Sequence, residues 1–145
     1  MNEEIPLEEE YLGGLESGRM KKGMVAGYGI YATNKRIIGV KSRRALGKAL
    51  AGSAFGVVGA YVGMKLSRDQ SVKAIADLDE KKDFEVAKEN VSNLELKKPT
   101  MWRRGHIVIS MSSGEPVKIT IADKRDFERV MALMHAFRPE VVITP

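Results

Sequence analysis

The chain has 145 residues, of which 43% are hydrophobic and 30% are charged, and its formal net charge is +5. These values are ordinary for a globular protein and allow one domain with a substantial core. The absence of cysteine excludes disulfides, thiolate metal ligands and cysteine nucleophiles. The N-terminus is acidic and has no apolar signal region, so we expect a cytoplasmic protein that associates with a membrane, if at all, at its periphery.

Residues 1–18 carry six acids and no bases. We predict a solvated acidic arm there, with one helical turn over residues 7–12 as the alternative. The next thirty residues, 19–48, carry nine bases and no acids. This basic window favours an anionic partner, which can be a membrane surface, a nucleic acid or the acidic arm of the same chain.

Two strands are predicted inside the basic window. Residues 24–33 mix β-branched, aromatic and glycine residues, a composition typical of a strand. Asn34 tolerates the left-handed conformation of a tight turn. Residues 36–41 are therefore expected to return as the second arm of a hairpin.

Residues 45–66 form the most unusual stretch, with no charge between residues 49 and 64. Interior glycines cost a helix about 1 kcal/mol each relative to alanine, so a glycine stripe favours close packing against another helix. A short membrane segment, a buried core helix, or two short segments turned at glycine are the alternatives. The residues assigned to helix packing share one helical face: Gly52, Gly56, Gly59 and Gly63.

After this stretch the pattern alternates between charged breaks and short apolar segments. Residues 72–78 fit a strand or a short helix, and a charged turn is predicted over residues 79–83. Strands are predicted over residues 84–87 and 91–97, and Pro99 ends the second of them.

The C-terminal third is predicted to be a hairpin followed by a helix. Residues 106–111 and 117–121 are joined by a turn that contains Gly114. Asp123 can cap the helix and Pro139 stops it. The expected apolar face consists of Phe127, Val130, Met131, Met134 and Phe137.

This order of elements predicts a mainly β protein with α-helices, of the α+β class. Short antiparallel strands and one terminal amphipathic helix favour a strongly bent sheet or partial barrel with the helix over one open end. An inserted glycine-rich helix would interrupt that sheet.

Residues 31–40 (YATNKRIIGV) resemble the prokaryotic pleckstrin-homology-like domains of the GRAM type. The strand over residues 91–97, the glycine hairpin and the terminal helix agree with that family. The resemblance covers residues 19–42 and 72–138. It implies a seven-stranded bent β-structure capped by a helix, which associates with membranes through lipid headgroups or protein partners and has no catalytic activity.

The resemblance sets the expected domain organisation. Residues 1–18 would be the arm, residues 19–138 the PH-like domain, residues 43–68 an insertion in it, and residues 139–145 a tail. Strands on both sides of the insertion belong to one sheet, so a single membrane crossing is disfavoured. The insertion is expected to lie in the membrane interface, to re-enter, or to project as a helical arm.

The candidate binding residues come from the basic window and from the loop after Pro99. An exposed tryptophan beside arginines suits a membrane interface or a partner contact, whereas a tryptophan folded back on the core is the alternative. The residues assigned to anion or lipid binding are Lys21, Lys22, Lys35, Arg36, Lys41, Arg43, Arg44, Lys48, Trp102, Arg103 and Arg104.

Nothing in the sequence predicts an enzyme, a metal site or a cofactor. His106 and His135 have no metal-type partner at helical spacing, and the acids of residues 77–83 alternate with lysines as in a solvated turn. We therefore expect a non-enzymatic module that binds anionic lipids or a membrane protein. A soluble homo-oligomer built through the glycine stripe and a nucleic-acid-binding protein remain the alternatives.

Overall fold

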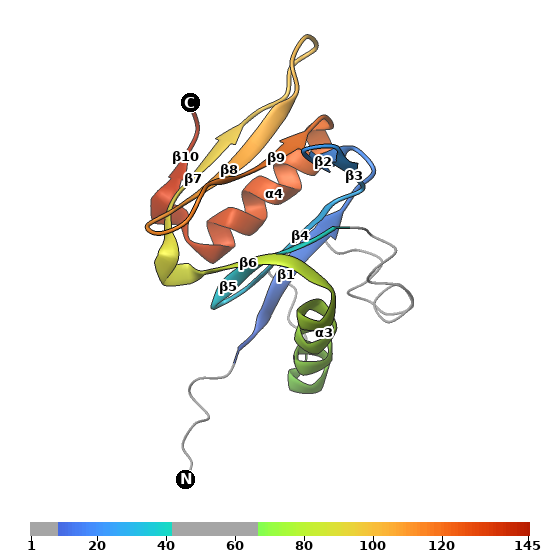
Figure 1. Ribbon diagram of the computed structural model, residues 1–145, viewed down its shortest axis with the longest axis vertical. Coiled ribbons are helices and arrows are strands. Elements are labelled where there is room, and N and C mark those ends of the chain that lie inside the picture. Colours follow the sequence, from blue (N-terminus) through green and yellow to red (C-terminus); the bar gives the residue numbers. More distant parts are fainter. Residues whose placement is uncertain (1–8, 42–66) are drawn as a thin grey trace.

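The structure is a computed structural model that describes residues 9–41 and 67–145 (Figure 1). The described residues form ten strands in two sheets and two α-helices, which confirms the predicted α+β class. The insertion assignments for Arg43, Arg44, Lys48 and the four stripe glycines lie outside the described residues. Within the described ranges, no helix is long and apolar enough to cross a membrane.

The first sheet, called sheet A, is an antiparallel meander in the order β1-β4-β5-β6. Its strands are β1 (Tyr11–Glu16), β4 (Gly29–Thr33), β5 (Arg36–Val40) and β6 (Lys82–Ala87). The predicted hairpin is confirmed in β4 and β5, which pair directly. The strand expected over residues 24–33 is shorter than predicted, because residues 25–26 pair with residues 21–22 in the other sheet.

The second sheet, called sheet B, has the order β10-β7-β8-β9-β2-β3. Its central strands β7 (Val91–Lys97), β8 (Gly105–Met111) and β9 (Val117–Ile121) form the predicted antiparallel meander. The short β2 (Met20–Lys22) and β3 (Val25–Ala26) extend one edge, and β10 (Val142–Ile143) pairs parallel to β7 at the other.

Helix α4 (Lys124–Phe137) lies between the two sheets and supplies much of the shared core (Figure 1). The predicted apolar face is confirmed, since Phe127, Val130, Met134 and Phe137 are buried and Met131 is half-buried. Asp123 occupies the N-cap position, but its side chain makes no capping bond. Its carboxylate instead faces Arg19 at 3.7 Å.

Helix α3 (Arg68–Lys81) covers the opposite face of sheet A, where Ala74, Ile75 and Leu78 pack on Tyr31 and Ile38. Of the two readings of residues 72–78, the helix is therefore correct. Its first turn is fixed by a capping box between Ser67 and Gln70. The charged turn predicted over residues 79–83 is wrong, because α3 continues to Lys81 and β6 begins at Lys82.

Strand β1 replaces part of the predicted solvated arm. Residues 11–16 pair with β4, and a bulge between Tyr11 and Gly13 lets Tyr11 and Leu15 reach opposite faces of sheet A. Gly14 lies inside this strand, and the ring of Tyr31 lies against it. A Cβ there would be 2.2 Å from Tyr31 Cδ2. The glycine pair therefore permits close packing inside a strand.

Candidate functional site

The predicted basic surface is divided by the fold. Lys35 and Arg36 lie at the β4–β5 turn, whereas Lys41 lies at the opposite end of the same hairpin, next to the Val40–Gly29 pair. The positive charges of Lys22 and Lys41 both stabilise the carboxylate of Asp83, and Lys22 Nζ is 3.3 Å from that carboxylate. The structure therefore does not gather the described bases of residues 19–41 into one patch.

Arg36 is surrounded by carboxylates. Its guanidinium makes bidentate contacts with Glu9, at 2.7 and 3.2 Å, and with Asp79, at 2.6 and 2.9 Å. A third carboxylate, Glu85, also accepts from it, and only 16% of the Arg36 side chain is exposed. These contacts join the start of the described chain, helix α3 and strand β6. Assigning Arg36 to anion binding is therefore incorrect, since its donors are already used.

The electrostatics of this group, called the Arg36 cluster (Glu9, Arg36, Asp79, Lys82 and Glu85), follow from these contacts. Hydrogen bonds from Arg36, and then from Lys82, lower the pKa of Asp79 to about 2. Hydrogen bonds from Lys82, and then from Arg36, lower the pKa of Glu85. The carboxylates raise the pKa of Arg36 above its already high ordinary value. The cluster is an internal ion-pair network with a structural role.

The loop between β7 and β8 projects beyond sheet B at the top of the view (Figure 1). At its tip Met101 is 90% exposed and Trp102 is 88% exposed. The alternative in which the tryptophan folds back on the core is thereby excluded. Two apolar side chains of this size in solvent mark a contact surface.

Backbone hydrogen bonds hold this tip in one shape. Thr100 N–H donates to the carbonyl of Arg103 at 2.8 Å, and the Thr100 hydroxyl accepts from the N–H groups of Trp102 and Arg103. At the base, a Cβ on Gly105 would be 2.2 Å from the Lys97 carbonyl, so the two arms are close together. A turn that is already ordered loses less entropy when it binds.

The basic side chains around the tip are exposed, and the loop segment that carries them contains no acidic residue. The segment from residue 97 to residue 104 contains four bases and no carboxylate. The loop therefore combines an apolar tip with positive charge, the combination that favours an anionic interface. The exposed bases are Lys97, Lys98, Arg103 and Arg104.

The neighbouring outer face of sheet B adds further positive charge. Cross-strand pairing places Lys97, His106, Thr120 and Lys21 in one row, so their side chains share a face. The next row on this face contains Lys118 and, two strands away, Glu95. Of the predicted anion-binding residues that the structure describes in the strands of sheet B, Lys21 thus lies in the row next to the base of the loop.

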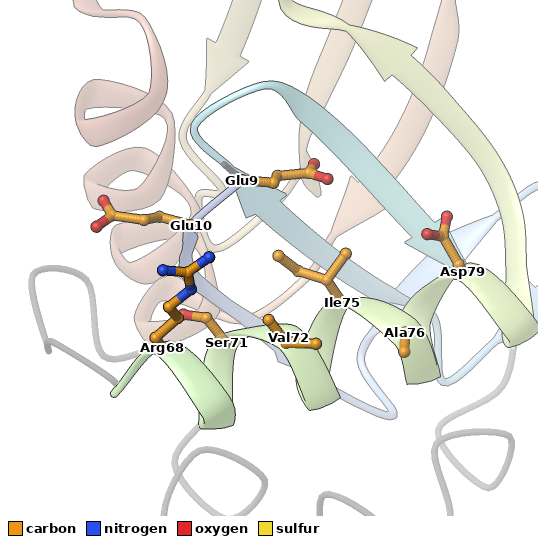
Figure 2. A pocket seen from close by; sticks show the side chains of 8 residues that line it. All are labelled: Glu9, Glu10, Arg68, Ser71, Val72, Ile75, Ala76 and Asp79. Carbon is orange, nitrogen blue, oxygen red and sulfur yellow. The ribbon is translucent and has the colours of Figure 1, made fainter. Parts of the chain in front are cut away.

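A pocket of about 440 Å³ lies along helix α3 at the other end of the molecule (Figure 2). Val72, Ile75 and Ala76 supply its apolar wall, and Val72 is 56% exposed. Its polar lining comes from Glu9, Glu10, Arg68, Ser71 and Asp79. Sequence reasoning missed this pocket because it assigned residues 1–18 to a free arm. The helical spacing of Val72, Ile75 and Ala76 was the available signal.

The described part of the chain has no group of three or more His, Asp or Glu side chains able to hold a metal ion. His106 Nε2 and Glu95 Oε2 form a pair at 2.6 Å on the outer face of sheet B. Comparisons with protein-family models, with curated proteins and with solved structures gave no match for this chain.

Proposed function

We propose that this chain is a non-enzymatic, PH-like module of the GRAM type that binds an anionic membrane surface through its β7–β8 loop. The observation that carries the proposal is the exposure of Met101 and Trp102 on one ordered turn between bases. Tryptophan is favoured at the level of the lipid headgroups, where its ring is apolar and its N–H is hydrated.

The topology supports the family part of the proposal. A four-stranded meander (β1-β4-β5-β6) precedes a three-stranded meander (β7-β8-β9), and the C-terminal helix α4 packs between them. These seven of the ten described strands, with the terminal helix, would correspond to the elements that the resemblance implies, and β10 adds a further edge strand beside β7. The hairpin β2–β3 and helix α3 are additions within the connections of that meander.

Electrostatics supports the anionic part. Each base near an anionic leaflet contributes about 1 kcal/mol, so the four loop bases together contribute about 4 kcal/mol at moderate ionic strength. This attraction falls off within a Debye length, about 10 Å at 0.1 M salt. Binding is therefore expected to weaken as salt is added and to require the loop to approach the surface.

Vesicle co-sedimentation at low protein concentration tests the proposal. The full chain should sediment with vesicles that contain phosphatidylserine and stay in solution with phosphatidylcholine alone. The double variant Met101→Ser/Trp102→Ser should lose most of the binding. Met24→Ser is the matched control, because Met24 is 97% exposed in the turn between β2 and β3.

Two results would contradict the proposal. One is a chain that stays in solution with both vesicle types at low salt. The other is equal binding by the loop variant and the control. Retention of oligonucleotides with steep salt dependence, without vesicle binding, would instead favour the nucleic-acid alternative.

A further inference from the structure

We propose that the β7–β8 loop of one copy docks into the α3 pocket of a second copy, so that the protein self-associates head to tail. This contact is distinct from the one to the membrane and does not depend on it. It uses two features that are exposed among the residues described in the structure: the apolar tip of the loop and the apolar wall of the pocket.

The two surfaces agree in size and polarity. Met101 and Trp102 are almost fully exposed, and the pocket offers about 440 Å³ with Val72 and Ile75 along its wall. That volume lies in the range of about 300–1,000 Å³ in which pockets accept compact ligands. Burial of a tryptophan in a partner's pocket is a common way to concentrate binding energy in a small contact.

The two surfaces also agree in charge. Within residues 9–41 and 67–145, the pocket lining has three carboxylates, Glu9, Glu10 and Asp79, against one guanidinium, Arg68. Glu9 and Asp79 already bind Arg36, but each carboxylate can accept further hydrogen bonds. The exposed Glu10 carries its charge at the rim (Figure 2). The loop brings four bases and no acids to this rim.

The positions of the two surfaces make the contact intermolecular. The β7–β8 loop lies at the top of the molecule and helix α3 at the bottom, along its longest axis (Figure 1). The β7–β8 loop of one copy therefore cannot reach the α3 pocket of the same copy. A contact between two different surfaces is heterologous, so a docked pair keeps one free loop and one free pocket and continues to grow.

The contact is small, so the association is expected to be weak. Interfaces that bury less than about 1,200 Å² are typical of transient complexes. Docking removes the tip of the loop from solvent and therefore competes with membrane binding. A vesicle surface would dissociate the assemblies, since both reactions use Trp102.

Complementary variants test this arrangement in buffer without lipid. Trp102→Ala removes the main apolar side chain of the loop tip and leaves the pocket intact. Val72→Asp leaves the loop tip intact and adds a negative charge to the apolar wall of the pocket. Both positions are exposed, so each variant should fold, and circular dichroism checks this. Lys73→Asp, at an exposed α3 position outside the pocket lining, is the matched control.

Sedimentation equilibrium should show a wild-type mass that rises with concentration above the 16.0 kDa monomer. Each variant alone should stay monomeric, and Lys73→Asp should behave as the wild type. An equimolar mixture of the two variants should form a dimer and nothing larger. The emission of Trp102 in the Val72→Asp chain should shift to shorter wavelength on mixing, because this is the single tryptophan of the sequence.

Three results would overturn the inference. The first is a wild type that remains monomeric up to about 1 mM, the weak end of the affinities expected for so small a contact. The second is self-association of either variant to the same extent as the wild type. The third is a mixture of the two variants that stays monomeric. None of them bears on vesicle binding at low protein concentration, so failure here is distinguishable from failure of the proposed function.

Discussion

The β4–β5 turn and the β7–β8 loop both present basic residues at the end of a hairpin, but the fold uses them in opposite ways. Arg36 at the first hairpin is held by Glu9, Asp79 and Glu85. Arg103 and Arg104 at the second are exposed beside Trp102. The difference shows that a base is available for binding only where the fold brings no carboxylate to it.

The largest expected effect is the loss of stability on replacing Arg36. Arg36→Ala leaves Asp79 and Glu85 with Lys82 and leaves Glu9 with the Thr33 hydroxyl, so the free energy of unfolding should fall by about 2–3 kcal/mol. Arg103→Ala/Arg104→Ala should change it by less than about 0.5 kcal/mol. Urea denaturation of the three chains measures both values, and equal losses would contradict the contrast.

The reverse ranking is expected for membrane affinity. Arg103→Ala/Arg104→Ala should weaken binding to anionic vesicles by about 2 kcal/mol, or roughly 30-fold. Arg36→Ala, measured where it is still folded, should bind as the wild type does. The matched control Arg125→Ala/Arg129→Ala removes two exposed bases of α4. If this control weakens vesicle binding equally, the effect comes from the net charge of the protein and not from the position of the two loop arginines.

The pH dependence of stability should follow the Arg36 cluster. The pKa values of Asp79 and Glu85 are lowered in the folded state, so their contribution is present above their unfolded values and is lost as pH falls toward 2. After solvent screening, Asp79 should contribute at most about 1 kcal/mol. The free energy of unfolding should be measured between about pH 6 and pH 2, on both sides of the ordinary carboxyl pKa of about 4. It should decline less in Arg36→Ala than in the wild type. A parallel decline would refute this assignment.

The smallest effect is expected from the turn itself. Thr100→Val removes the acceptor of the Trp102 and Arg103 N–H groups and leaves the size of the side chain unchanged. Stability should change by less than about 1 kcal/mol, because the turn is exposed. Vesicle affinity should fall by about two- to fivefold, because a looser loop loses more entropy on binding. Unchanged affinity would mean that the order of the turn does not matter.

Local patterns were sufficient to predict most of the fold. The face of Phe127, Val130 and Met134, the alternation of β7 and the hairpin of β8 and β9 are periodic in the sequence, and all three are observed. Strand β1 could not be predicted in this way. The glycines and acids of residues 9–16 indicate a loop until Tyr31 and Arg36, which are distant in sequence, become their partners.

The candidate site was predictable only in part. Trp102, Arg103 and Arg104 were singled out by the loop that follows Pro99, and their exposure agrees with that reading. The pocket needed the pairing of β1, which places Glu9 and Glu10 beside helix α3. The sequence also could not show that the donors of Arg36 are occupied within the chain, because two of its carboxylate partners are more than forty residues away.

The most direct test of the account is quenching of Trp102 by lipids brominated along their acyl chains. Because Trp102 is the single tryptophan, its emission reports the position of the β7–β8 loop and nothing else. With vesicles that contain phosphatidylserine, the emission of Trp102 should shift to shorter wavelength, and quenching should be strongest for bromines near the headgroups. Bound protein whose Trp102 is neither shifted nor quenched would show that another surface holds the membrane, and would contradict the account.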